Sequence, residues 1–292
     1  MIKAVEKAKA KINLFLEVLG KRDDGYHEIE SVMAPVGIFD EVEVSLTDGE
    51  ITLDTDASLC ERPSDFEELD EKNNLAYRAA EEFFASLDEK NVPHGGVEIR
   101  IRKKIPVRSG LAGGSADAAA VLRAMNDLFD GVLEESELLF TAEKLGSDVP
   151  FCVLSRLAVC RGRGDDITVI ESPVKLHGVL TVECDEKLST GSAYSKVDYY
   201  NENEKTEVKC SDDMVRALEL CDTAAVKNEL YNVFEKACGY SASGAEIMKD
   251  AGADNVTLSG AGPAVFTLTD DASLCEKIAE ALRAGGYPAY IF

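Results

Sequence analysis

The chain has 292 residues, of which 45% are hydrophobic, and its formal net charge at pH 7 is -24. This length and composition indicate a folded protein with one large or two ordinary domains. The negative charge disfavours nucleic-acid binding, and no apolar run approaches the roughly 18 residues of a membrane span. Because residues 1–6 also lack the apolar core of a secretory signal, we expect a cytoplasmic protein whose eight cysteines are reduced thiols.

The first half of the chain predicts a mixture of strands and helices. Apolar residues alternate over 10–20 and 97–105, and shorter strands are expected at 42–46 and 50–53. Pro106 ends the strand at 97–105, because proline lacks the N–H that a sheet requires. Two helices are predicted by apolar residues at intervals of three and four, at 74–87 and 115–128.

The second half continues this mixed pattern. Helices are expected at 212–220, 243–251 and 272–284, and strands at 255–259 and 264–268. The two strands are separated by the turn Gly260-Ala261-Gly262, and the polar segment 198–213 is expected to be an exposed connection. The three histidines are too scattered to suggest a local metal site.

Residues 106–115, Pro-Val-Arg-Ser-Gly-Leu-Ala-Gly-Gly-Ser, form a glycine-rich loop between a predicted strand and a predicted helix. Glycines let several backbone N–H groups converge on one anion, and the helix start adds its free N–H groups and dipole. Ser115 could cap this helix or offer its hydroxyl to a phosphate or to magnesium. The loop is not a Walker A motif, because no lysine follows Gly113-Gly114 at the required place.

Positive charges gather before and within this loop, although the chain as a whole is strongly acidic. They are Arg100, Arg102, Lys103, Lys104 and Arg108. A cluster of cations beside a glycine-rich loop favours a local anion site. The simpler alternative is a solvated strand face followed by a turn.

The loop resembles the phosphate-binding motif of the GHMP kinases. Residues 9–27, from Lys9-Ala10-Lys11-Ile12-Asn13 to Gly25-Tyr26-His27, are similar to the opening of the 4-diphosphocytidyl-2-C-methyl-D-erythritol kinases, which act in non-mevalonate isoprenoid synthesis. Further matches follow in family order at Asn74-Leu75, 145–151, 189–194 and 258–266. The Tyr26-His27 element is the most specific match, because it separates these enzymes from other GHMP kinases.

The resemblance implies an α+β, two-domain GHMP-kinase fold with its active site in the cleft between domains, which we expect at residues 1–158 and 159–292. It also implies ATP-dependent phosphorylation of the 2-hydroxyl of a cytidine diphosphate-linked alcohol. Asp148 would accept or orient the proton of that hydroxyl, and Lys11 would stabilise both the carboxylate and the transferring phosphoryl group. Magnesium would be held mainly by ATP phosphates, without a dedicated protein metal site. The protein would be a monomer or a homodimer.

The resemblance further assigns binding residues. ATP would be held by Asn74, Leu75, Lys103, Pro106, Gly110, Leu111, Ala112, Gly113, Gly114 and Ser115. The substrate would be held by Asn13, Tyr26, His27, Asp148, Thr190, Tyr194 and Gly260. Tyr194 would stack on the cytosine from the other domain. Taken alone, Asp148 is more typical of a helix cap or a loop anion, Lys11 of a solvated charge, and Tyr26-His27 of a polar turn.

Some positions depart from the family pattern. Arg108, Ser109 and Ala112 stand where glycine or alanine is usual, and Ala116 where a second serine is common. Residues 182–185 replace a proline-containing segment, which concerns the shape of the substrate-side loop.

Two alternative functions stay open from the sequence. One is another GHMP kinase that acts on a sugar, homoserine or a mevalonate-like alcohol, although Tyr26-His27 and Tyr194 argue for a base in the substrate. The other is a non-catalytic nucleotide-binding regulator, although Lys11 and Asp148 are both present.

Overall fold

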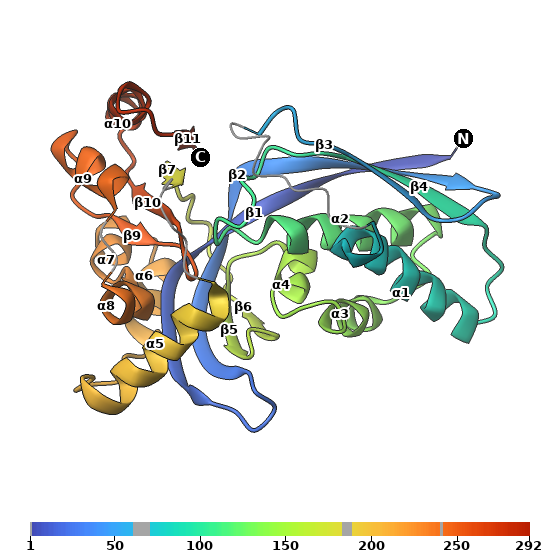
Figure 1. Ribbon diagram of the computed structural model, residues 1–292, viewed down its shortest axis with the longest axis horizontal. Helices are drawn as coiled ribbons and strands as arrows, with labels where there is room; N and C mark the ends of the chain where they lie inside the picture. Colours follow the sequence, from blue (N-terminus) through green and yellow to red (C-terminus); the bar gives the residue numbers. More distant parts are fainter. Residues whose placement is uncertain (1, 61–70, 183–188, 240–241) are drawn as a thin grey trace. The chain divides into compact units, whose positions relative to one another are not determined.

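The computed structural model describes residues 2–60, 71–182, 189–239 and 242–292 (Figure 1). The chain divides into two compact units, each assembled from several segments. Unit 1 comprises residues 1–10, 38–107 and 112–155, and unit 2 comprises residues 11–37, 108–111 and 156–292. The expected division of the sequence at residue 158 stays a prediction.

Two long strands, β1 (Lys3–Lys21) and β2 (His27–Thr47), contribute residues to both units. In unit 1, residues 41–47 of β2 pair antiparallel with β4 (Gly96–Arg102), and β4 pairs in parallel with β3 (Thr52–Asp56). The predicted alternation of β4 is confirmed, because its three apolar residues are buried and the charged residues between them are not. A half-buried strand of this kind supplies one face of a core.

Four α-helices lie in the described part of unit 1. They are α1 (Leu75–Glu89), α2 (Gly113–Leu128), α3 (Glu135–Glu143) and α4 (Val149–Leu154). The short 3-10 helix η2 (Glu71–Asn73) precedes α1. The predicted apolar face of α1 is confirmed, since Ala79, Phe83 and Leu87 are fully buried. α2 packs against both α1 and α4, so the glycine-rich loop leads into the central helix of this unit.

The start of α2 differs from the sequence prediction. The helix begins at Gly113, two residues early, after Ala112 has taken a left-handed conformation with a φ of 58°. Ser115 is therefore the third helical residue, and the prediction that it caps the helix is wrong. Two consecutive glycines allow this early start, because they place no side chain in the crowded turn.

Unit 2 contains two groups of paired strands. Residues 29–33 of β2 pair antiparallel with β5 (Ala158–Gly162), β5 pairs with β6 (Asp166–Val169), and β1 pairs in parallel with β8 (Tyr231–Asn232). A separate antiparallel sheet has the order β11 (Tyr290–Ile291), β7 (Gly178–Val182), β10 (Ala264–Leu268), β9 (Thr257–Leu258). The described helices of unit 2 are α5 (Thr190–Asn203), α6 (Asp212–Glu219), α7 (Thr223–Asn228), α8 (Val233–Cys238), α9 (Ser243–Asp250) and α10 (Ala272–Ala284).

Most predicted elements of the second half are confirmed, but two change. The strand expected at 255–259 covers only residues 257–258. At position 255, the Asn255 side chain and not its backbone makes the hydrogen bonds to the Leu268 backbone. The connection expected at 198–213 begins later, because residues 198–203 belong to α5. Ala193 and Val197 of this helix are buried in unit 2. Packing of that apolar face stabilises the helix, so that its polar residues after position 197 are helical too.

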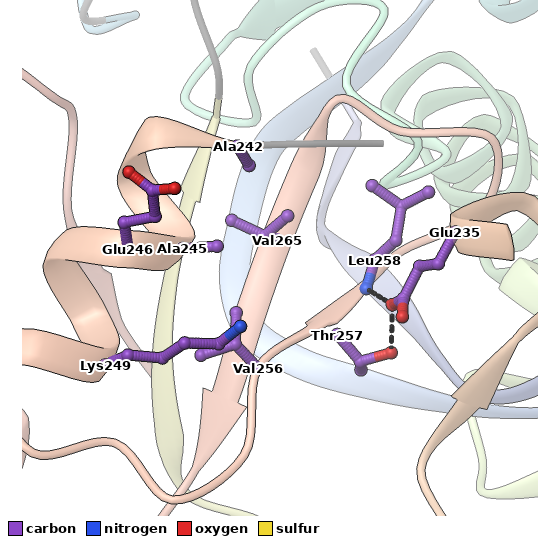
Figure 2. Close-up of a pocket in the computed structure, with 9 residues that line it drawn as sticks. All are labelled: Glu235, Ala242, Ala245, Glu246, Lys249, Val256, Thr257, Leu258 and Val265. Atoms are coloured by element: carbon purple, nitrogen blue, oxygen red, sulfur yellow. Dashed lines mark hydrogen bonds between the residues drawn. The ribbon is translucent and has the colours of Figure 1, made fainter. Parts of the chain in front are cut away.

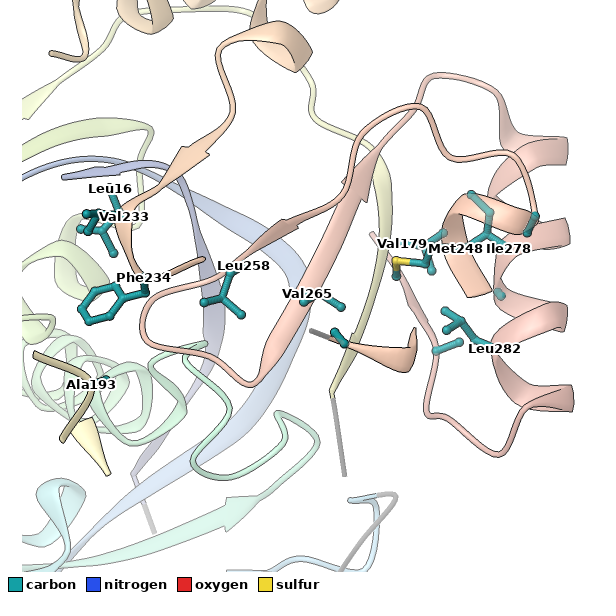
Figure 3. Packing of buried hydrophobic residues seen from close by; sticks show 14 of the residues in the cluster. Leu16, Val179, Ala193, Val233, Phe234, Met248, Leu258, Val265, Ile278 and Leu282 are labelled. Carbon is teal, nitrogen blue, oxygen red and sulfur yellow. The ribbon is translucent and has the colours of Figure 1, made fainter. Parts of the chain in front are cut away.

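A hydrophobic cluster holds unit 2 together (Figure 3). Leu16 of β1, Phe234 of α8, Val265 of β10 and Ile278 of α10 are all nearly or fully buried in it. Burial of each such side chain stabilises the fold by roughly 1.5–3 kcal/mol. The cluster thus fixes β1 and β10, the two strands next to the glycine-rich segments described below. In the part of the chain that the structure describes, no helix is both long and apolar enough to cross a bilayer.

Candidate active site

A row of polar side chains on β1 is buried in unit 2. Lys11 Nζ donates a hydrogen bond to Asn13 Oδ1 (2.8 Å), Asn13 Nδ2 donates to Ser31 Oγ (2.9 Å), and Ser31 Oγ donates to the carbonyl of Phe15 (2.7 Å). Lys11 is 4% exposed and Asn13 is 1% exposed, so the interpretation of Lys11 as a solvated charge is wrong. Because each group has a partner, the chain can hold an ammonium at a defined place inside the protein.

Three segments far apart in sequence meet around Lys11. The amide of Lys11 donates to the carbonyl of Leu111 (3.1 Å), and Ser259 Oγ donates to the carbonyl of Gly110 (3.1 Å). A Cβ added at Gly260 would lie 3.2 Å from the Gly110 oxygen and 3.6 Å from Lys11 Nζ. Within unit 2, the structure therefore brings together β1, the first glycine-rich segment and the second.

The second glycine-rich segment, residues 260–262, is held in place by side chains that no sequence pattern indicated. Asn232 Nδ2 donates to the carbonyls of Leu258 (2.8 Å) and Gly260 (2.9 Å). The Glu235 carboxylate accepts hydrogen bonds from Thr257 Oγ1 (2.5 Å) and the Leu258 amide (2.6 Å), at the edge of a pocket of about 190 Å³ (Figure 2). Neither residue lies in a recognisable motif, so sequence reasoning missed both.

In unit 1, the start of α2 presents backbone N–H groups. No side chain of the described residues caps this helix, so the amides of Gly113, Gly114 and Ser115 remain available to a ligand. Gly114 is exposed, and a Cβ there would meet only Leu75 Cδ1, at 3.9 Å. The predicted residue Asn74 caps α1, since its Oδ1 accepts from the Ala76 amide (2.9 Å).

Lys103 is buried beneath this helix start. Its Nζ donates to Asp40 Oδ2 and to Asp117 Oδ2, each at 2.5 Å, and a Cβ added at Gly113 would lie 3.5 Å from it. Asp40 also accepts hydrogen bonds from the amides of Lys104 and Ile105. The ion triad of Lys103, Asp40 and Asp117 thus ties β2 and the residue after β4 to α2.

This arrangement corrects the expected cluster of cations. Besides Lys103, Arg100 pairs with Glu98 (2.8 Å) and Arg102 pairs with Glu41 (3.1 Å). Carboxylates on neighbouring strand or helix positions therefore pair with three of the five cations. These three charges do not form an open anion-binding surface. Whether Lys103 also contributes to ATP binding stays a prediction.

Burial raises the pKa of Asp117 to about 8, and this effect outweighs the attraction of Lys103. The unfolded chain loses this proton at roughly pH 4, so between roughly pH 4 and about pH 8 the folded state binds more protons than the unfolded state. Linkage then requires that the free energy of unfolding falls as pH rises through this window.

We expect Asp117→Asn to remove that contribution, because an amide keeps an oxygen for Lys103 but does not ionise. Urea unfolding at intervals from pH 5 to pH 8 should show a stability difference between variant and wild type that shifts in favour of the variant as pH rises. Parallel curves for the two proteins would contradict this assignment.

Asp148 stands at the residue before α4 in unit 1. Its backbone carbonyl accepts from the Cys152 amide (3.1 Å), but its side chain takes no capping hydrogen bond from the described helix start. Asp148 is thus the N-cap residue of α4 by position, but its side chain does not cap the described helix start. Because Lys11 belongs to unit 2 and Asp148 to unit 1, their expected cooperation stays a prediction.

The aromatic residues assigned to the substrate lie together in unit 2. The rings of His27 and Tyr194 are 4.5 Å apart at 30°, and His27 Nε2 is 2.8 Å from Asp198 Oδ1. Tyr26 is half exposed beside the Arg163 guanidinium (4.9 Å). We expected Tyr194 to come from the other domain, but residues 11–37 pack with residues 156–292 in one unit.

The substrate-side loop is described only in part. Thr190 is the exposed first residue of α5. The atypical segment noted in the sequence, residues 182–185, lies outside the described residues from position 183 onward.

Known proteins resemble this chain over almost its whole length. Two family models match it, the GHMP kinases N terminal domain at residues 74–156 and the GHMP kinases C terminal domain at residues 213–288. A 4-diphosphocytidyl-2-C-methyl-D-erythritol kinase of Brevibacillus brevis is 38% identical over 95% of this chain and 91% of that protein. One of the same name from a Nostoc species is 33% identical over 94% and 90%.

The chain belongs to the 4-diphosphocytidyl-2-C-methyl-D-erythritol kinase family. The fold agrees, since a crystal structure of a 4-(cytidine 5'-diphospho)-2C-methyl-D-erythritol kinase superimposes with a TM-score of 0.78 at 29% identity, covering 99% of this chain and 98% of that one. A homoserine kinase from Cytophaga hutchinsonii has a TM-score of 0.70 at 20% identity over 100% and 93%, which shows a shared fold. The expected α+β GHMP-kinase fold and the family resemblance are therefore confirmed.

Proposed function

We propose that this protein uses ATP to phosphorylate the 2-hydroxyl of 4-diphosphocytidyl-2-C-methyl-D-erythritol. The observation that carries the proposal is the buried ammonium of Lys11, held where β1 and both glycine-rich segments meet. Relatives at 33–39% identity that bear the name of this kinase support the choice of substrate.

The chemistry needs a positioned hydroxyl and a cation for the charge that develops on the transferred phosphoryl group. Lys11 suits the second role, because its hydrogen bond to Asn13 orients the ammonium before the reaction. The buried lysine side chain therefore loses little conformational freedom when the phosphoryl group is transferred. Asp148 suits the first role, because a carboxylate can accept the hydroxyl proton as a general base. We propose that the two act on the same transfer step.

The glycine-rich segment suits a nucleotide triphosphate. The uncapped N–H groups at Gly113, Gly114 and Ser115 can bind phosphate oxygens, and α2 adds the positive end of its dipole. Pro106, Gly110, Leu111 and Ala112 would shape the approach, and Leu75, in contact range of Gly114, would border the base. Magnesium, held by ATP phosphates with Ser115 as a protein ligand, would neutralise phosphate charge.

The other end of the substrate calls for stacking and polar recognition. Tyr26, His27 and Tyr194 supply aromatic surfaces within unit 2, and His27 supplies a ring nitrogen. Thr190 and Gly260 would border the diphosphate and alcohol portions. ATP as donor and a charged, diphosphate-linked acceptor favour a cytoplasmic site of action.

A direct assay tests the function. Purified protein with ATP and magnesium should transfer phosphate to 4-diphosphocytidyl-2-C-methyl-D-erythritol and show no comparable turnover with homoserine, mevalonate or galactose. Failure of CMP to compete with the substrate would favour another GHMP kinase, because those acceptors carry no base. Tight ATP binding without turnover of any acceptor would favour a non-catalytic regulator.

Asp148→Asn should lower kcat by about 10²–10⁴-fold, the usual contribution of a general base, and leave the affinity for ATP within twofold. Quenched-flow or coupled assays give kcat, and calorimetry gives the ATP affinity. Lys11→Met serves as a second probe: if both residues act on one step, the double variant should be about as slow as the slower single variant. Wild-type rates in Asp148→Asn would contradict its role.

A further inference from the structure

The ring of His27 is fixed on two sides within unit 2. Tyr194 lies against it at 4.5 Å between centroids, and Tyr194 in turn meets Phe234 edge to face at 5.0 Å and 85°. Asp198, one helical turn after Tyr194 on α5, places Oδ1 2.8 Å from His27 Nε2. The His27 side chain is 11% exposed, so its orientation is set by these neighbours more than by water.

Asp198 also decides which ring nitrogen carries the proton. An ionised carboxylate accepts hydrogen bonds but cannot donate them, so its partner Nε2 must be the N–H. In the neutral imidazole, Nδ1 is then an acceptor. An acceptor can bind an amino group but not a carbonyl oxygen.

We propose that Asp198 is a positioning residue that fixes the Nε2–H tautomer of His27 and thereby makes the base site select cytosine over uracil. Cytosine carries an amino donor at the position where uracil carries a carbonyl acceptor. This inference rests on the proposed function, because it requires that His27 faces the base of the substrate.

The simpler role for Asp198 is to hold α5 against the β1–β2 hairpin. A matched control exists for that role, since Asn201, one turn further along α5, donates from Nδ2 to the carbonyl of Val18 (2.9 Å). Asn201 joins the same helix to the same hairpin without touching His27. Loss of the helix contact alone should weaken binding of all bases equally.

The experiment compares binding of CMP and UMP by calorimetry in the full-length protein and three variants. Asp198→Asn should reduce the preference for CMP over UMP by about 10-fold, the equivalent of one polar contact in a partly buried site. Asp198→Glu should restore most of that preference, and Asn201→Ala should leave the CMP to UMP ratio unchanged. Turnover at saturating substrate should stay within about twofold of wild type in Asn201→Ala.

A second measurement reports the tautomer directly. With only three histidines in the chain, ¹⁵N-labelled histidine gives a resolvable imidazole spectrum, and a His27→Gln variant assigns its signals. The wild-type ring should carry its proton on Nε2, and Asp198→Ala should lose this preference.

Equal losses for CMP and UMP in Asp198→Asn, or a wild-type ring protonated on Nδ1 alone, would overturn the inference and leave the kinase proposal intact. Equal binding of CMP and UMP by the wild-type protein would overturn the inference in the same way, whereas a wild-type protein that does not bind CMP would instead overturn the proposed substrate.

Discussion

Replacing Lys103 with methionine should destabilise the protein by about 3–5 kcal/mol, the usual cost of removing one partner from a buried ion pair. Its side chain is 4% exposed, and the two carboxylates that it joins are 0% and 6% exposed. Methionine fills most of the space but leaves Asp40 and Asp117 facing each other without a cation. The desolvation of these buried acidic groups, no longer offset by the ammonium, would then act against folding.

The neighbouring residue provides the control for this prediction. Arg102, the last residue of β4, pairs with Glu41, but both side chains are about half exposed or more. Arg102→Met should therefore cost no more than about 1 kcal/mol. Urea unfolding of both variants measures the difference, and a loss below 1 kcal/mol for Lys103→Met would contradict a structural role for the triad.

The same pair of variants separates folding from nucleotide binding. If Lys103 acts through the position of α2, Asp117→Asn introduced beside Lys103→Met should recover part of the lost stability, because the new amide can donate a hydrogen bond to Asp40 in place of the lost ammonium. A direct electrostatic contact with ATP would not be recovered in this way. ATP affinity of the folded double variant distinguishes the two roles.

Gly110→Ala should destabilise unit 2 by about 2–5 kcal/mol and abolish most kinase activity. The φ of Gly110 is +83°, a conformation that costs a non-glycine residue roughly 1–2 kcal/mol. A Cβ there would also lie 2.3 Å from the carbonyl oxygen of Ser259, and forced overpacking of this kind adds typically 1–3 kcal/mol. The two glycine-rich segments must then move apart, which disturbs the surroundings of Lys11.

Gly286 isolates the backbone contribution. Its φ is +82°, nearly that of Gly110, but no atom of the described residues lies within 4 Å of a Cβ built on it. Gly286→Ala should lose only the roughly 1–2 kcal/mol of backbone strain and keep wild-type kcat. Similar losses of stability for the two variants would show that the close approach to Ser259 has no energetic weight.

Local patterns in the sequence predicted much of the fold. Period-two alternation located β4, and apolar spacing located α1 and α10, because the face that an element buries leaves its period in the sequence. The sequence did not reveal where α2 begins, since the two glycines at its start are compatible with loop or helix. It also could not show that Asn255 shortens β9, because that contact joins residues 13 positions apart.

The candidate site was predicted by family resemblance more than by physical reasoning on the residues alone. Lys11 and Asp148 each have a simpler interpretation in isolation. The structure removes that of Lys11 through burial, and the Asp148 side chain does not cap the described helix start. Asp40, Asp117 and Asp198 carry no motif. Their importance arises from partners 14 to 171 positions away, which no local pattern encodes.

The sequence by itself determined the family, the order of most strands and helices, and the identity of the glycine-rich segments, because these depend on residues close together in the chain. Only the tertiary structure decided that three of the five cations near the first segment pair with carboxylates, that Tyr26, His27 and Tyr194 share one unit, and that Lys11 is buried. The physical reason is that charge pairing and desolvation depend on distance in space, and distance in space is fixed only when the chain packs.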